Sequence, residues 1–204
     1  MRLSVSIMLI AMLAAAADAW AGAPPPAELF AKAATVRVYL YDADPTKNPG
    51  IMRDFHTLDA TAVPGRGITL DAKQAERVKH AFTVATGEQA LGACFVPRHG
   101  FVFEDAKGEV IGTLDVCFEC TNYSIDAPGY KARVQPVYDR FAKLGQWTEK
   151  LQRKQTHEVD AVRATFDMPP TDAPVDWKGL EALVIELGLP PKPKPADYER
   201  LRKP

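Results

Sequence analysis

Apolar and polar residues alternate along the segment from Thr35 to Tyr41, which places Val36, Val38 and Leu40 on one face of an extended chain. This period of two predicts a half-buried β-strand. The following residues, 42–67, hold three prolines and three glycines among polar positions, and this composition predicts a long loop with room for one short strand. Residues 68–70 then indicate the end of a further strand.

A helical period replaces the alternation after residue 70. Asp71 and Gln74 form a capping box, so we expect a helix that begins there and ends at Gly87. The C-terminal third has apolar residues at helical spacing and glycines at the ends of the stripes. It predicts three helices: one from Pro136 to Gly145, one that carries apolar residues from Trp147 to Phe166 and is ended by Met168-Pro169-Pro170, and one from Asp176 to Gly188.

Short strands are indicated between these two helical regions, over residues 93–96, 100–104 and 109–118. The last two flank Asp105-Ala106-Lys107-Gly108, a good hairpin turn because glycine adopts a positive φ without strain. If Glu104 faces Glu109 across that turn, the register predicts three further cross-strand pairs: Val96 with Cys117, Arg98 with Asp115, and His99 with Leu114.

These elements predict an α+β fold, in which a small antiparallel sheet with a packed helix is followed by a helical C-terminal part. The expected organisation is a signal peptide at 1–21, a Pro-containing leader at 22–34, an α+β core at 35–130, a helical part at 131–188 and a Pro/Lys-rich tail at 189–204.

The N-terminal segment differs in composition from the rest of the chain. Met1-Arg2 is followed by a nearly uninterrupted apolar run up to Ala17 and then by small residues up to Ala23. A positive start, an apolar centre and a small-residue cleavage zone are typical of a secretory signal peptide. Since a membrane-spanning helix needs about 20 apolar residues, we expect an exported chain, periplasmic or secreted, with no stable membrane anchor.

Charge is balanced over the chain, with 25 Lys and Arg against 26 Asp and Glu. Nucleic-acid binding needs a clustered positive field, so this balance argues against DNA or RNA as a partner. The sequence also lacks a glycine-rich phosphate loop, a G-x-S-x-G elbow and an H-E-x-x-H motif. The expected partner is therefore a protein or a small molecule, and the chain leans away from the common enzyme classes.

The chemically distinctive residues lie between Cys94 and Cys120. Cys94 begins the sequence C-F-V-P-R-H-G, which includes His99, and Cys117 begins the sequence C-F-E-C. The pairing of C-x-x-P-R-H-G with a downstream C-F-x-C resembles a family of uncharacterised exported bacterial proteins. The resemblance spans roughly residues 93–122 and implies no activity.

Three interpretations of Cys94, His99, Cys117 and Cys120 stay open. Exported thiols oxidise, which favours a disulfide from Cys94 to Cys117 or to Cys120, and the odd cysteine count leaves one thiol over. The same four side chains match a closed structural zinc site in number and kind. Alternatively, Cys117 and Cys120 cycle as a dithiol, or a cysteine acts as a nucleophile with His99. The loop-like sequence after Cys120 argues against the dithiol, because such motifs usually open a helix.

Arg98 and Asp115 are expected to form a cross-strand ion pair. The alternative is that Arg98 and His99 together bind an anion. No catalytic residue is assigned, and zinc at the Cys/His cluster is the one cofactor considered. The favoured function is an exported binding or interaction module stapled by that cluster. The alternative is a thiol-dependent enzyme or redox protein that uses Cys117, Cys120 and His99.

Overall fold

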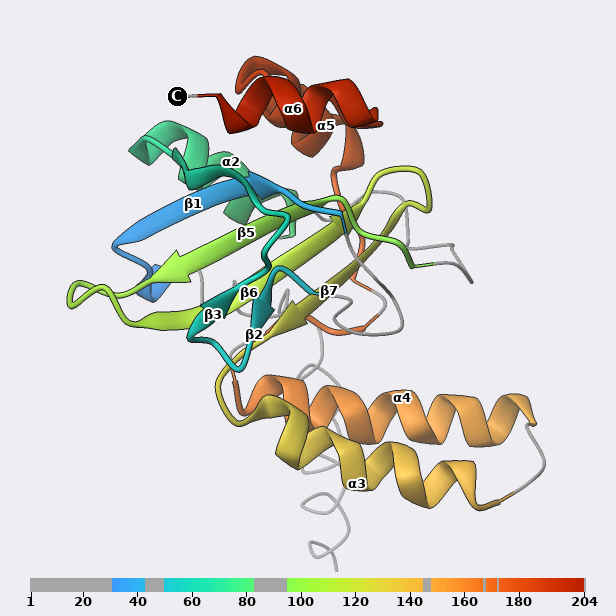
Figure 1. Cartoon of the computed structure of the whole chain (residues 1–204). Coiled ribbons are helices and arrows are strands. Elements are labelled where there is room, and N and C mark those ends of the chain that lie inside the picture. Colours follow the sequence, from blue (N-terminus) through green and yellow to red (C-terminus); the bar gives the residue numbers. More distant parts are fainter. Residues whose placement is uncertain are drawn as a thin grey trace, which may run out of the picture.

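The computed structural model describes residues 31–42, 50–82, 95–144, 148–166, 168–171 and 173–203. The described residues form a five-stranded antiparallel sheet in the order β4-β1-β5-β6-β7 (Figure 1), with the bounds β1 Thr35–Leu40, β4 Val63–Thr69, β5 His99–Glu104, β6 Val110–Cys117 and β7 Asn122–Asp126. The sheet and its helices confirm the predicted α+β class with a helical C-terminal part. The predicted signal peptide and the first part of the leader lie outside the described residues.

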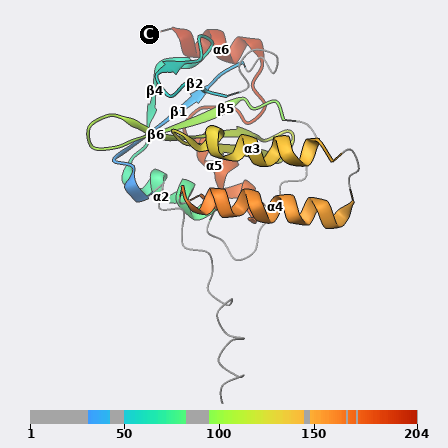
Figure 2. The same ribbon diagram turned by 90° about the horizontal axis from the view of Figure 1, so that it is seen from below.

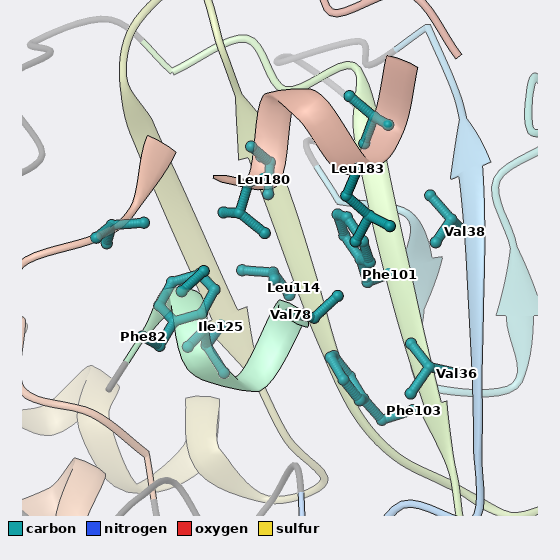
Figure 3. Close-up of a cluster of buried hydrophobic side chains, with 14 of the residues drawn as sticks. Val36, Val38, Val78, Phe82, Phe101, Phe103, Leu114, Ile125, Leu180 and Leu183 are labelled. Carbon is teal, nitrogen blue, oxygen red and sulfur yellow. The ribbon is translucent and has the colours of Figure 1, made fainter. Parts of the chain in front are cut away.

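One face of the sheet is covered by α2 (Ala72–Ala81) and α5 (Trp177–Glu186). Apolar side chains of β1, β5, β6 and β7 pack there against apolar residues of the two helices and against Phe82, just past α2 (Figure 3). The labelled side chains of this core are Val36, Val38, Val78, Phe82, Phe101, Phe103, Leu114, Ile125, Leu180 and Leu183. All of them are buried. Burial of a large apolar side chain contributes roughly 1.5–3 kcal/mol relative to exposure, so this layer is the main source of stability.

Helix α2 begins at the capping box that the sequence predicts. The Asp71 carboxylate accepts the backbone N–H of Gln74, and the Gln74 side chain accepts the backbone N–H of Asp71. The helix ends at Ala81, before the expected Gly87, and residues 83–94 lie outside the described part of the chain.

Helix α5 follows the prediction closely. The Asp176 side chain accepts the Gly179 N–H at 2.9 Å, which caps the first turn, and Gly188 takes a φ of 74° just past the end. The backbone N–H of Asp176 donates to the Ala81 carbonyl at 2.9 Å. The start of α5 therefore satisfies a carbonyl at the end of α2, and the two helices are joined at that point.

Helices α3 (Tyr130–Ala142) and α4 (Glu149–Ala164) pack side by side as a helical hairpin (Figures 1 and 2). Pro136 is expected in the first turn, but it lies inside α3. The helix extends back to Tyr130 because its buried residues recur at helical spacing and join the core on that side; they are Tyr130, Val134 and Phe141. Among the described helices, none combines the length and the apolar character needed to cross a lipid bilayer.

The C-terminal residues do not behave as a separate tail. Helix α6 (Pro195–Arg202) begins with a proline at its first turn, where a missing N–H costs nothing. Tyr198 and Leu201 pack against the main core, and the Tyr198 hydroxyl donates to the Tyr41 carbonyl at 3.2 Å. This part of the predicted Pro/Lys-rich tail is thus tied to the sheet.

Strand β7 and most of β4 lie where the sequence predicts a loop, and the last residues of β4 coincide with the predicted strand end at 68–70. Strand β4 contains Pro64, Gly65 and Gly67, and β7 follows directly after the turn that holds Cys120. An edge strand tolerates proline because one side of it donates no ladder hydrogen bonds. The prolines and glycines that indicate a loop in isolation are therefore compatible with a strand at the edge of the sheet.

The β5–β6 hairpin turn forms as predicted, with Gly108 at a φ of 81° and its N–H donated to the Asp105 carbonyl at 3.0 Å. The predicted register is wrong, because the turn adds one residue and a bulge beyond it adds another. The observed partners are Val110 for Glu104, Val116 for His99 and Asp115 for Gly100.

A second hairpin covers the opposite face of the sheet, formed by β2 (Met52–Arg53) and β3 (Thr57–Leu58). The residue before it, Ile51, is buried in a small second core together with Tyr39, Tyr41 and Val102. A Cβ on Gly100 would lie 2.3 Å from the Cβ of Ile51. Strand β1 is therefore buried on both faces rather than half-buried, and glycine at position 100 lets the hairpin approach the sheet.

Candidate functional site

The described members of the predicted Cys/His cluster lie in different environments. Cys94 lies outside the described residues, Cys117 is a free buried thiol, and Cys120 is disulfide-bonded. His99 pairs with Val116 and shares its face of the sheet, so the next side chain, that of Cys117, belongs to the other face. Within the described ranges, no group of three or more His, Cys, Asp or Glu side chains is placed to hold a metal ion.

The Cys117 thiol lacks the surroundings of a reactive cysteine. Cys117 is 2% exposed and is the last residue of strand β6. Cys120 lies in the turn that follows this strand. Neither cysteine opens a helix, whose N-terminus is what lowers the thiol pKa in dithiol motifs. These positions give no support to the dithiol interpretation.

His99 is a core residue. It is fully buried, and its ring packs edge-on against Phe118, with centroids 4.9 Å apart. Neither ring nitrogen has a hydrogen-bond partner of acceptable geometry in the described part of the chain. Burial lowers the pKa of His99 to about 3, and the nearby Pro190 carbonyl opposes this shift. At neutral pH His99 is uncharged.

Arg98 pairs with the Asp42 carboxylate, so the predicted ion pair with Asp115 is wrong. The register error explains the difference, since Asp115 lies opposite Gly100. Arg98 is partly exposed, whereas His99 is neutral and inside the core. The two residues proposed to bind an anion therefore do not present a joint positive site.

Asp115 belongs to the second core instead. Its Oδ1 accepts the Tyr41 hydroxyl at 2.7 Å and the Ile51 backbone N–H at 2.8 Å. Burial raises the pKa of Asp115 to about 7, while these two hydrogen bonds act in the opposite direction. Burial and the nearby carboxyl also raise the pKa of the Tyr41 hydroxyl. The pair holds the start of the β2–β3 hairpin against the sheet.

A concave site of about 760 Å³ lies beside this hairpin, and we call it the hairpin groove. Its volume is in the range typical of small-molecule sites. It is bounded by the β2–β3 hairpin, the β5–β6 turn and the segment before α3, and it is lined by Tyr39, Met52, Asp54, Phe55, His56, Leu58, Val102, Glu104, Gly108, Glu109, Val110, Pro128 and Gly129.

Tyr39 lines the groove. It is 6% exposed, and its ring and hydroxyl lie close to Gly67 of β4. Burial raises the pKa of this hydroxyl. The positive charge of Arg37 lowers this pKa to a smaller extent, and the negative charge of Glu104 raises it further. The phenol therefore stays protonated at neutral pH and can donate a hydrogen bond to a bound molecule.

The tip of the β2–β3 hairpin brings Asp54 and Phe55 to the groove through a strained turn. Both residues have a positive φ, 51° and 62°, and the His56 N–H donates to the Arg53 carbonyl at 3.3 Å. This is the type I′ geometry that glycine and asparagine usually supply. A bulky residue in that region costs about 1–2 kcal/mol, which the rest of the fold must offset.

Few features of the sequence point to the groove residues. Tyr39 and Tyr41 alternate with the predicted core positions of the strand expected over residues 35–41. Two aromatic side chains on a face expected to be solvated are the one available signal. Asp54 is a residue that such a turn accepts, but Phe55 is not, so the pair Asp54-Phe55 does not predict the turn.

Comparison with known proteins does not assign this chain to a family, since no family model, no curated protein and no solved structure matches it.

Proposed function

We propose that this chain is an exported binding module and that its ligand occupies the hairpin groove. The observation that carries the proposal is the groove itself, a concavity of small-molecule size that combines apolar and polar lining residues. The apolar part of the lining includes Val102, Met52 and Leu58 beside Tyr39. Export rests on the signal-like sequence of residues 1–21 and is part of the proposal.

The cysteines fit a structural role in such a module. Three cysteines are present, Cys117 is free and Cys120 is disulfide-bonded. We propose that the remaining one, Cys94, is the partner of Cys120. A bond between them would tie the β6–β7 turn to the segment that precedes β5, and it would stabilise the sheet mainly by restricting the unfolded chain.

Groove binding can be tested by filling the site. Leu58 lines the groove and is partly buried, so the variant Leu58→Trp should occupy part of its volume. Leu144, just past the end of α3, is 51% exposed and does not line the groove, so Leu144→Trp is the matched control. We expect ligands that raise the Tm of the wild type to act equally on Leu144→Trp and to lose their effect on Leu58→Trp.

The measurement is thermal unfolding against a panel of small organic cations, anions, neutral polyols and apolar compounds. A ligand at about one hundred times its Kd stabilises the fold by roughly 3 kcal/mol, which raises the Tm by several degrees. If compounds stabilise Leu58→Trp as strongly as the wild type, the groove is not the site. If no class of compound raises the Tm of the wild type, the binding proposal fails.

A further inference from the structure

We infer that the hairpin groove binds an organic cation, an ammonium or guanidinium group carried on an apolar stem. This inference rests on the proposed function and names the chemical class of the ligand. It starts from the charged groups around the groove. Three carboxylates line it, those of Asp54, Glu104 and Glu109, and the lining includes no Lys or Arg among the described residues.

The compensation of these carboxylates is incomplete. Glu104 receives the Arg37 guanidinium, whose Nε lies 3.2 Å from both carboxylate oxygens. Among the described residues, the one hydrogen-bond donor to the Asp54 carboxylate is the backbone N–H of His56, at 3.3 Å. The Glu109 carboxylate forms no ion pair with a Lys or Arg of the described ranges. Asp54 and Glu109 thus leave a negative potential over the groove, which attracts positive charge.

The groove also contains groups that recognise the body of such a ligand. Phe55 and Tyr39 are aromatic, and a cation near an aromatic face gains roughly 0.5–2 kcal/mol. Tyr39, which is 6% exposed and lines the groove, carries a hydroxyl that can exchange a hydrogen bond with the ligand. Val102 and Leu58 offer apolar surface to an alkyl or aryl stem.

A bare metal ion does not fit this arrangement. A divalent cation needs several oxygen ligands within about 2.6 Å, and no three acidic, histidine or cysteine side chains of the described ranges are close enough to supply them. An organic cation can contact carboxylates that are spread along a groove. The spacing of the charges therefore favours an extended ligand over an ion.

Calorimetric titration with matched probes tests this inference. The free-amine arm compares 2-phenylethylamine with 2-phenylethanol. The side-chain arm compares Nα-acetyl-lysine amide with Nα-acetyl-norleucine amide, which lacks the ammonium group. We expect at least one cation to bind the wild type about tenfold more tightly than its neutral partner, as one or two screened charge contacts would give. The arm that binds shows whether the cation is a free amine or a basic side chain.

The double variant Asp54→Asn/Glu109→Gln should remove most of this preference and leave the neutral compounds unchanged. Asparagine accepts the positive φ of position 54. The control variant Glu119→Gln/Asp139→Asn removes the same charge from exposed positions outside the groove lining and should keep the preference. Raising the salt concentration should weaken the binding of the cationic probes and leave the binding of the neutral probes unchanged.

Two results would overturn the inference in different ways. If each neutral compound binds as tightly as its cation and Leu58→Trp abolishes both, the groove is a binding site but its ligand is not a cation. If no probe binds, or if binding survives Leu58→Trp, then the cation and the groove fail together.

Discussion

His99 and Asp115 lie on opposite faces of the sheet, and burial favours the neutral form of each. The pKa of His99 falls from 6.5 to about 3, and that of Asp115 rises from 3.8 to about 7. Between about pH 4 and 6.5 the unfolded chain binds the proton of His99 and the folded chain does not, so this residue lowers stability as the pH falls. In the same range the folded chain binds the proton of Asp115 and the unfolded chain largely does not, so Asp115 raises stability as the pH falls.

Single substitutions should separate the two effects. We expect His99→Leu to become more stable relative to the wild type as the pH is lowered from about 6.5 to 4.5, by up to about 2 kcal/mol. Asp115→Asn keeps an oxygen for Tyr41 and Ile51, and it should become less stable relative to the wild type over the same change. The measurement is urea unfolding at both pH values, and comparison with the wild type cancels the other titrating groups. A shift of the same sign in both variants would contradict this account.

The sequence could identify His99 as chemically notable but not as a core residue. A histidine five positions after a cysteine suggests a metal site. Whether His99 and Cys117 share a face depends on the hairpin register and on strand alternation, and a bulge that shifts the register has no sequence signal here. The packing around Phe118, which makes His99 neutral, depends on contacts with distant segments.

The position of the β2–β3 hairpin depends on the glycine at position 100. Gly100 leaves the space into which Ile51 packs, and Ile51 in turn donates its N–H to Asp115. The groove is formed partly by this hairpin. The fold of the sheet and the shape of the proposed site are therefore coupled through Gly100.

A methyl group at position 100 should displace the hairpin. We expect Gly100→Ala to lower the free energy of unfolding by about 1–3 kcal/mol, the usual cost of overpacking, and to weaken any ligand of the groove. A Cβ added to Gly65, in β4, would meet no atom within 4 Å, so Gly65→Ala is the matched control and should stay within about 1 kcal/mol of the wild type. Equal stability of the two variants in urea would show that Ile51 adjusts without cost.

Elements with local signals were predictable, and those defined by distant contacts were not. The capping box at Asp71 and the Asp176 to Gly188 segment contain their own start and stop residues, so α2 and α5 followed from the sequence. Strands β4 and β7 exist because β1 and β6 offer them partners. Helix α6 is short, and its contacts with the core are made by Tyr198 and Leu201.

For the molecule as a whole, the state of the cysteines depends on the compartment in which the protein resides. A disulfide persists in an oxidising environment and is rare in the cytosol. The proposed export and the proposed bond between Cys94 and Cys120 are therefore consistent with each other. Cys117, buried in β6, would remain reduced because oxidants reach it poorly.

Intact mass of the chain recovered from an exporting host tests both proposals. We expect loss of the first ~21 residues, in line with a cleaved signal. Under denaturing conditions, one cysteine should be alkylated without reduction and all three after reduction. Cys117→Ser should show no alkylation without reduction, and peptide mapping should join Cys94 to Cys120. Three alkylated cysteines before reduction would refute the disulfide, and a retained N-terminal segment would refute cleavage.

Strand β4 has a consequence for how copies of this molecule meet each other in solution. It forms one edge of the sheet, where helix α6 contacts it, and any uncovered part of a sheet edge is a template on which a second chain can add a strand. Pro64 offers no N–H for such pairing, and the exposed charge of Arg66 would have to be enclosed by it. Pro64, one of the residues that make this segment resemble a loop, and the exposed Arg66 thus hinder the addition of a second chain at this edge.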